Sequence, residues 1–195
     1  MNSRAHSALD QGTASLFADG IDCGDQFSAD RKYRYRLWRI WDPTKTVFLF
    51  CMLNPSLATW DKLDNTCLRV QRFVQKWQGG GFIVTNCFGL VDTNPAGLYT
   101  SVDPVGPEND VAIRQAATRA DVVVAAWGNH AGLGQRADAV YQLLVSVKKP
   151  IHCLAITKTG EPGHPLYLSS NLKPQIYDRT IRKPAQADEP QALEP

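Results

Sequence analysis

The stretch DVVVAAWGNH, residues 121–130, carries the two features from which the fold can be predicted. After Asp121 comes an unbroken apolar run rich in valine, which is typical of a strand buried on both faces of a parallel sheet. The run ends in Gly128, Asn129 and His130. Ligands bind at the carboxyl ends of the strands in sheets of this kind, so the polar end of this stretch is a candidate site.

Strands and helices alternate on both sides of this stretch. Short apolar runs predict strands, and apolar residues at three- and four-residue spacings predict helices between them. The alternation predicts an α/β protein with a three-layer α/β/α arrangement and a short, mainly parallel central sheet. An Arg- and Tyr-rich run at 33–41 predicts an additional N-terminal antiparallel strand, because the turn DPTK separates it from the next apolar run. The predicted core strands are 46–53, 82–86, 121–127 and 151–157, and the predicted helices are 66–78, 107–119 and 135–147.

The chain of 195 residues is long enough for one domain with a substantial core. Residues 1–30 are small and polar and show no sustained period, so we expect a flexible leader there. Residues 181–195 are rich in proline and acidic side chains, and we expect a disordered tail. The single α/β domain is therefore predicted over residues 31–180.

Composition narrows the classes of function. The net charge of +2 is lower than that of most dedicated DNA-binding proteins, so charge alone gives little support to a nucleic-acid partner. No run approaches the roughly 18 apolar residues of a membrane span, and we expect no membrane partner. Three of the five cysteines, Cys51, Cys87 and Cys153, fall in or beside predicted strands, as expected of core residues in a reduced, cytoplasmic protein. The sequence leaves the oligomeric state open.

Signatures of several kinds of site are missing from the sequence. The glycines at 79–81 precede a predicted strand rather than a helix, so they do not form a phosphate-binding loop. His152, Cys153 and His164 lack the spacing of metal-ligand pairs. We therefore expect neither a metal nor a cofactor, and a site built from carboxylate, amide, hydroxyl and imidazole groups.

Polar residues follow each of the four predicted core strands. Because the carboxyl ends of parallel strands lie at one edge of a sheet, we expect these residues to converge on one site. Asp61, Asp64 and His164 are the candidate catalytic residues, since carboxylates and imidazoles can transfer protons. The candidate substrate-binding residues are Asn54, Pro55, Ser56, Asn86, Trp127, Gly128, Asn129 and Tyr167.

Each of these clusters also has a purely structural interpretation. The triplet 54–56 consists of residues that commonly build a turn. Asp64 is well placed to cap the helix predicted over 66–78, and Asp61 can be a solvated loop charge. The remaining candidates can likewise serve a loop, the core or a turn, and these are Asn86, Trp127, Gly128 and His130.

The stretch GEPGHPLYLSSN, residues 160–171, follows the last predicted strand. Its glycines and prolines predict a tight turn, and His164 lies between Gly163 and Pro165. A turn of this kind fixes the backbone of the histidine and exposes its ring. We therefore interpret the loop as part of a site rather than as a simple closure of the domain.

The run RKYRYRLWR, residues 31–39, interleaves basic and aromatic side chains. Basic groups contact phosphates and aromatic rings stack on bases, so Arg34, Arg36 and Arg39 are candidate nucleic-acid contacts. On a regular strand, Lys32, Arg34 and Arg36 lie on the same face. The alternative is that these arginines lie along the core and support neighbouring carboxylates.

The chain from Tyr33 to Ile176 resembles a bacterial and phage family of unknown function. The resemblance covers nearly all of the predicted domain, with its motifs in the same order, but it implies no particular reaction. The motifs are YRYRLWR at 33–39, LNPS at 53–56, D-x-T at 64–66, DPVGPEND at 103–110, AAWG at 125–128 and G-x-P-x-HPLYL at 160–168.

The order of elements is also similar to that of the uracil-DNA-glycosylase superfamily. In those enzymes a Pro-containing loop after the first core strand positions the attacking water, and a His-Pro loop after the last strand stabilises the departing base. The resemblance implies that 54–56 correspond to the first motif, Asn86 to a base-reading residue and His164 to the histidine of the last motif. Since no carboxylate lies within 54–56, Asp61 or Asp64 would have to activate the water.

Three classes of function remain open. The first is a glycosylase-like hydrolase that releases a base from DNA or from a nucleotide and needs His164 and one carboxylate. The second is a non-catalytic module that binds a nucleotide or nucleic acid on the same scaffold. The third is a transferase of modified-base metabolism, whose product would not be a free base.

Overall fold

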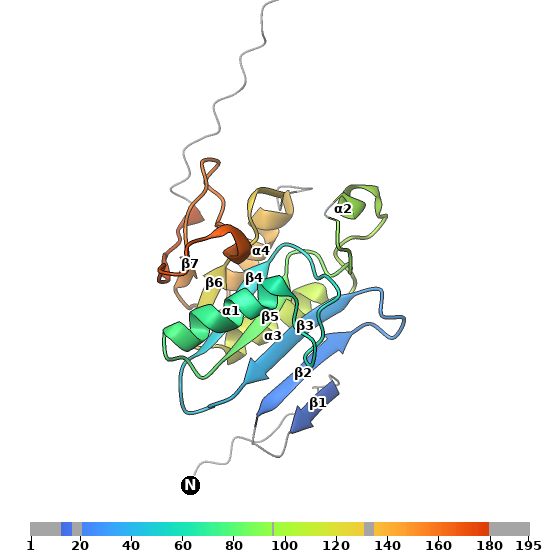
Figure 1. Ribbon diagram of the computed structural model, residues 1–195. Helices are drawn as coiled ribbons and strands as arrows, with labels where there is room; N and C mark the ends of the chain where they lie inside the picture. Colours follow the sequence, from blue (N-terminus) through green and yellow to red (C-terminus); the bar gives the residue numbers. More distant parts are fainter. Residues whose placement is uncertain (1–12, 17–20, 95, 131–134, 180–195) are drawn as a thin grey trace, which may run out of the picture.

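The structure is a computed structural model that describes residues 13–16, 21–94, 96–130 and 135–179 (Figure 1). The tail expected over 181–195 lies outside the described residues. The strands are β1 (Thr13–Leu16), β2 (Asp22–Phe27), β3 (Arg34–Ile40), β4 (Val47–Met52), β5 (Gly81–Asn86), β6 (Val122–Ala125), β7 (Ile151–Cys153) and β8 (Gln175–Ile176). The helices are α1 (Asn65–Lys76), α2 (Gly97–Thr100), α3 (Asn109–Arg119) and α4 (Arg136–Val145), with a short 3-10 helix, η2 (Pro165–Tyr167).

The described strands form one mixed sheet in the order β1-β2-β3-β5-β4-β6-β7-β8. Its centre, β5-β4-β6-β7, is parallel. The strands on both sides of this centre pair antiparallel. The protein is therefore α/β, as expected, but the prediction of a mainly parallel sheet is wrong, because antiparallel strands extend the parallel centre at both edges.

The position of β3 differs from the simplest expectation. The turn at 42–45 connects β3 to β4, but the two strands are not neighbours, because β5 lies between them. β3 pairs antiparallel with β5, and β5 pairs parallel with β4. The predicted N-terminal antiparallel strand thus exists, but it extends the sheet from β5 rather than closing a hairpin with β4.

The segment expected as a flexible leader, residues 1–30, contains strand β2. This strand pairs with β3 from Asp22 to Phe27, so residues 22–27 are part of the sheet. Its polar side chains bond to distant parts of the chain: Asp22 accepts a hydrogen bond from Trp38 Nε1 at 2.8 Å, and Asp25 accepts one from the Trp60 N–H. The strand was missed because it is held by such contacts rather than by alternating apolar residues.

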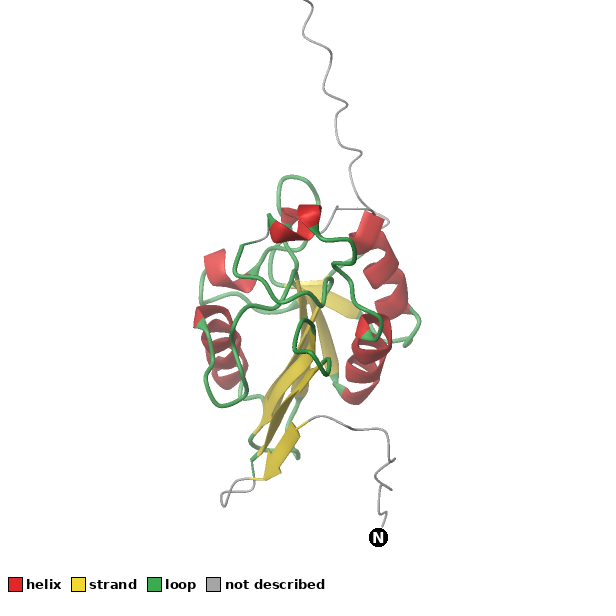
Figure 2. Cartoon of the chain, turned by 90° about the vertical axis from the view of Figure 1, so that its right-hand side faces the viewer, coloured by secondary structure: helices red, strands yellow, loops and turns green. Residues whose placement is uncertain are grey.

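Helices cover both faces of the sheet (Figure 2). On one face, α1 packs Phe73 and Val74 against a cluster that contains Phe50 and Phe82 of the sheet. On the other face, α3 and α4 pack against Leu49 and neighbouring sheet residues. No described helix is both long and apolar enough to cross a membrane.

The carboxyl ends of the central strands lie at one edge of the sheet. Met52 of β4 is paired with Asn86 of β5, and Cys51 is paired with Ala125 of β6. The loops that follow β4, β5, β6 and β7 therefore all leave the sheet from the same edge.

Candidate functional site

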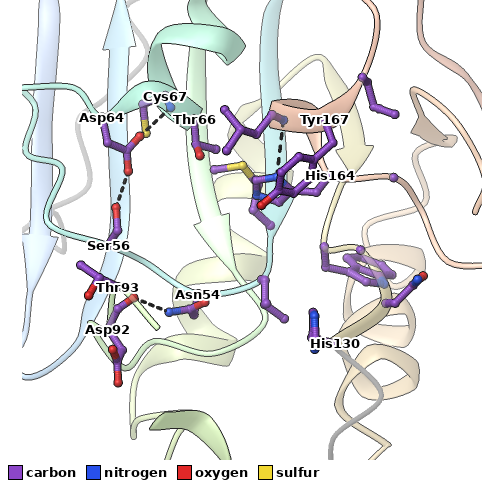
Figure 3. Close-up of a pocket in the computed structure, with 18 of the residues that line it drawn as sticks. Asn54, Ser56, Asp64, Thr66, Cys67, Asp92, Thr93, His130, His164 and Tyr167 are labelled. Carbon is purple, nitrogen blue, oxygen red and sulfur yellow. Dashed lines mark hydrogen bonds between the residues drawn. The ribbon is translucent and has the colours of Figure 1, made fainter. Parts of the chain in front are cut away.

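A cavity of about 490 Å³ opens at this edge of the sheet (Figure 3). Its walls come from β3, the loops after β4, β5, β6 and β7, the start of α1, and η2. The convergence expected from the strand ends is thus present for most of the predicted residues. Of these, the cavity is lined by Arg34, Asn54, Ser56, Asp64, Trp127, Gly128, Asn129, His164 and Tyr167.

Asp64 lies at the start of α1 and has two contacts there. Its Oδ1 accepts a hydrogen bond from the Cys67 N–H at 2.7 Å, which makes it the N-cap of the helix. Its Oδ2 accepts a hydrogen bond from the Ser56 hydroxyl. The capping role weighed for this residue is therefore confirmed, and the same carboxylate also lines the cavity.

The surroundings of Asp64 keep its carboxylate ionised. Burial alone raises the pKa of Asp64, but the hydrogen bonds from Cys67 and Ser56 and the positive charge of Arg34 outweigh it, so the pKa lies below its ordinary value. The neighbouring Cys67 behaves in the opposite way. Burial and the charge of Asp64 raise the pKa of the Cys67 thiol to about 12, so it is protonated at neutral pH and is not a ready nucleophile.

The His164 loop is fixed by backbone hydrogen bonds. The Gly128 N–H donates to Pro162 O and the Gly163 N–H donates to Ala155 O, both at 2.8 Å. Gly128 has a φ of +72°, a conformation that favours glycine, and a Cβ there would lie 3.6 Å from the Cβ of His164. The end of β6 and the His164 loop therefore lie directly against each other.

The ring of His164 has a defined tautomer. Its Nδ1 accepts a hydrogen bond from the Leu166 N–H, at 3.4 Å, at the start of η2. An imidazole nitrogen that accepts a hydrogen bond carries no proton, so the proton of the neutral ring is on Nε2. The centre of the Tyr167 ring lies 5.6 Å from the centre of the His164 ring. In Figure 3, these two residues lie on one side of the cavity, and Asp64 and Ser56 lie on the other.

His164 is neutral at physiological pH. Burial lowers the pKa of His164 to about 4, and the negative charge of Asp64 offsets only part of this effect. The cavity therefore combines an ionised carboxylate with a neutral imidazole that has a donor on Nε2. Such a difference in ionisation between two groups of one site is typical of acid–base chemistry.

Glu161 anchors the His164 loop to Trp127 and Arg179, a role that no motif in the sequence indicated. Its Oε2 accepts a hydrogen bond from Trp127 Nε1 at 2.9 Å, and the same oxygen is 2.6 Å from Arg179 Nη1. Glu161 is only 5% exposed. Because Trp127 follows β6, this contact ties the last loop to the end of the neighbouring strand.

Two asparagines of the cavity hold loops together. Asn54 Nδ2 donates to Asp92 O at 2.8 Å, which attaches the connection after β5 to the loop after β4. Asn129 Oδ1 accepts hydrogen bonds from Thr157 and Thr159, each at 2.8 Å. Both asparagines therefore have a structural role in addition to lining the cavity. His130, which was weighed as a loop residue, also lines the cavity, and the lining residues that were not singled out from the sequence include Thr66, Cys67, Asp92, Thr93 and Thr157.

Arg34 reaches the cavity because β3 is irregular. The pairing of β2 with β3 shifts register between Gln26 and Phe27, which is the pattern of a β-bulge. Arg34 consequently lies with Cys67 and Asp64 on the α1 side, whereas Arg36 lies over the ring of Trp38, which belongs to the cluster on the other face. The expectation that Arg34 and Arg36 share one face is wrong for this reason.

Five further candidates do not line the cavity. Asp61 is exposed on the loop before α1, and Pro55 is buried beside the lining. Asn86 is 1% exposed, its carbonyl accepts a hydrogen bond from Asn109, and its Nδ2 has no hydrogen-bond partner among the described residues. Arg36 donates to Gln26, and Arg39 is half-buried on β3.

A second, shallower depression of about 340 Å³ adjoins the cavity. Leu166 lines both, and Arg69 and Arg72 of α1 give the depression its positive charge. Arg69 is also tied to the residue that follows η2, because its Nη2 donates to Leu168 O. Among the described residues, no cluster of three or more His, Cys, Asp or Glu side chains could hold a metal ion.

The fold and the cavity define an α/β protein with a ligand-sized site at the carboxyl ends of its parallel strands. The family described as "Protein of unknown function (DUF1643)" matches residues 34–166, more than half of the chain, and the chain belongs to this family. The match includes Arg34, Asp64 and His164. No curated protein and no solved structure gave a significant match to the chain.

Proposed function

We propose that the protein is a hydrolase that cleaves the N-glycosidic bond between a base and a sugar in a nucleotide. The observation that carries the proposal is the pairing, in one cavity, of the ionised carboxylate of Asp64 with the neutral imidazole of His164. Two features of the fold also support the proposal, since helices cover both sheet faces and a His-Pro loop follows the last parallel strand. Five buried free cysteines agree with a reduced, cytoplasmic location.

Asp64 is assigned to the sugar side of the reaction. Cleavage of an N-glycosidic bond develops positive charge on the sugar, which a nearby carboxylate stabilises, and the same carboxylate can orient the attacking water. The hydrogen bonds from Ser56 and the Cys67 N–H hold the carboxylate in place. Because these contacts keep the pKa of Asp64 low, the carboxylate is charged over the physiological pH range.

His164 is assigned to the departing base. Negative charge develops on an oxygen of the base as the bond breaks, and the Nε2–H is the donor that the tautomer of His164 leaves available. A donor aimed at such developing charge is worth about 2.7–4 kcal/mol of transition-state stabilisation. Tyr167 and Trp127, which also line the cavity, provide aromatic surface for the base.

The test is release of free base, measured by mass spectrometry. The purified full chain is incubated with a nucleotide mixture and with single- and double-stranded DNA that carries uracil and other modified bases. We expect free base from the unmutated protein and a loss of at least about 100-fold for Asp64→Asn, which keeps a residue able to cap α1. Asp61→Asn is the matched control, because Asp61 belongs to the same loop and does not line the cavity.

Two results would contradict this assignment. The first is an equal rate of base release by the Asp61→Asn and Asp64→Asn variants, because the activity would then not depend on the carboxylate that lines the cavity. The second is the absence of free base from every substrate with folded protein.

A non-catalytic binding module is the second candidate, and one observation favours it. Both oxygens of Asp64 are already engaged, one by the helix cap and one by Ser56, so the carboxylate has a structural role with or without a reaction. The basic depression of Arg69 and Arg72 next to the cavity would suit an extended nucleic acid. This candidate predicts oligonucleotide binding that survives Asp64→Asn and is weakened by Arg72→Ser, with no release of base.

A further inference from the structure

Arg34 is a buried cation at the wall of the cavity. Its side chain is 2% exposed and lines the cavity next to Asp64 and Cys67. Within the described part of the chain, its guanidinium makes one hydrogen bond, from Nη1 to Ala58 O at 2.5 Å. None of the described carboxylates forms an ion pair with it.

Of the three other buried arginines of the described chain, two form ion pairs, and the third, Arg36, donates from its Nε to Gln26. Arg136 forms an ion pair with Asp110 at 2.5 Å and donates to Cys87 O, and Arg179 forms ion pairs with both Glu161 and Asp138. Burial of a charge without a partner is costly, which is why buried charges in proteins are normally paired. Arg34 differs from Arg136 and Arg179, because it forms no ion pair with a described residue and lines a cavity that a negatively charged ligand could enter.

The backbone of β3 is shaped to put Arg34 there. The register shift against β2 turns this side chain towards α1 and the cavity, while Arg36 lies on the other face. β-Bulges often re-aim a side chain next to a functional site. Burial lowers the pKa of Arg34, and the negative charges of Asp64 and Asp25 are among the causes that oppose this effect, so the arginine remains protonated at neutral pH.

We propose that Arg34 binds the phosphate of a nucleoside monophosphate, with the base of the same molecule directed towards His164. The placement of the base rests on the proposed function, whereas the anion-binding role of Arg34 does not. A guanidinium presents a planar fork of donors that matches two oxygens of a phosphate.

The site favours a single nucleotide over a polymer. Because Arg34 is almost fully buried, its free donors can be reached only by a group that enters the cavity. A terminal phosphate can enter in this way, whereas a phosphate within a strand is attached to a nucleotide on each side. The cavity volume of about 490 Å³ is also within the usual range for a small-molecule ligand.

The test is binding of matched ligands by isothermal titration calorimetry with the full chain. The probes are deoxyuridine monophosphate, the four common deoxynucleoside monophosphates and the corresponding nucleosides, together with a single-stranded hexanucleotide. Where a base is released, the titrations use the Asp64→Asn variant. For at least one base, we expect the monophosphate to bind about 10-fold or more tightly than its nucleoside, as for a hydrogen-bonded charge pair.

Arg34→Met should remove this preference and leave the affinity for the nucleoside unchanged. Arg36→Met is the matched control, because it removes an arginine from the same strand outside the cavity. The comparison of monophosphate with nucleoside in protein with Arg34 intact needs no variant, so it decides the question even if Arg34→Met does not fold. Equal affinity for the two ligands, tighter binding of the hexanucleotide, or no saturable binding of any monophosphate would overturn the proposal.

The proposed anion-binding role of Arg34 and the proposed hydrolase activity can be contradicted independently of each other. Binding of a monophosphate that depends on Arg34, without release of base, would support the anion site and contradict the hydrolase. Release of base from nucleosides and monophosphates at equal rates, unaffected by Arg34→Met, would support the hydrolase and contradict the anion site.

Discussion

Two buried polar regions lie side by side in this protein and differ in how completely their charges are paired. In the first, Arg179 Nη1 is 2.6 Å from Glu161 Oε2, its Nη2 donates to Glu161 Oε1, and its Nε is 2.6 Å from Asp138 Oδ1. Glu161 additionally accepts the Trp127 Nε1–H. In the second, the cavity, Arg34 has a single described hydrogen bond, and His164 Nε2 has no hydrogen-bond partner among the described residues.

The difference distinguishes buried charges that stabilise the fold from buried charges that are available to bind a ligand. In the cluster of Arg179, Glu161 and Asp138, which we call the saturated cluster, the charged groups already have partners within the protein. Its role is to hold the loop after β7 against the end of β6. An unsaturated cluster carries the cost of buried charge without full compensation. The loop from Gly160 to Leu168 connects the two, because Glu161 anchors it in the first region and His164 lines the second.

The largest expected effect is on the saturated cluster. Glu161→Ala leaves Arg179 and Trp127 without their shared acceptor, and removal of one partner from a buried ion pair costs about 3–5 kcal/mol. We expect a loss of this size in the free energy of unfolding, measured by urea denaturation. A loss below about 1 kcal/mol would mean that this cluster does not stabilise the fold.

The next effect concerns His164 and the pH. The pKa of His164 is about 4 in the folded protein and about 6.5 in the unfolded chain, so below pH 6.5 the unfolded state takes up the proton first. Stability attributable to His164 is therefore complete above pH 6.5 and is lost as the pH falls towards 4, by up to about 3 kcal/mol. Urea denaturation between pH 7 and 4.5 measures this dependence.

The matched variant for this measurement is His164→Asn. Asparagine can still accept the Leu166 N–H, but it does not titrate. The stability of this variant should fall less steeply with decreasing pH. Identical slopes for the variant and the unmutated protein would show that His164 titrates normally and is not held neutral by burial.

A smaller effect on stability is expected for Arg34. Arg34→Met removes a buried charge and leaves no described carboxylate without an ion-pair partner, so the free energy of unfolding should change by no more than about 1 kcal/mol, much less than for Glu161→Ala. Thermal or urea denaturation without ligand measures this change. If Arg34→Met were as destabilising as Glu161→Ala, the comparison would break down, and Arg34 would belong with the structural arginines.

The sequence predicts the centre of the fold well because its signals there are local. The expected helix at 66–78 corresponds to α1 (Asn65–Lys76), and Asp64 caps it as weighed. The apolar runs became β4, β5, β6 and β7, although β7 ends at Cys153. The edges were predicted poorly, since β2 is held by polar bonds to distant residues and the insertion of β5 between β3 and β4 has no local signature.

In the candidate site, too, residues with a local sequence signal could be predicted, and residues placed by long-range contacts could not. Asp64 and His164 could be found because turns and strand ends mark their positions in the sequence. The geometry of Arg34 could not be found, because a regular strand would have placed it on the face of Arg36, and only the register shift against β2 changes this. Glu161 was missed because its partners Trp127 and Arg179 are 34 and 18 residues away along the chain.

The smallest expected effect distinguishes the two carboxylates around Arg179. The side chain of Asp138 is 59% exposed, whereas that of Glu161 is 6% exposed, although their oxygens lie equally close to the same guanidinium. Water screens the exposed pair, so Asp138→Ala should lower the free energy of unfolding by only about 0–1 kcal/mol in urea denaturation. The two single variants therefore share a partner and a distance, and they differ in burial and in the additional contacts of Glu161 with Arg179 Nη2 and Trp127. If Asp138→Ala cost as much as Glu161→Ala, proximity rather than burial would decide which charges stabilise this fold, and the argument that assigns Arg34 to a ligand would lose its basis.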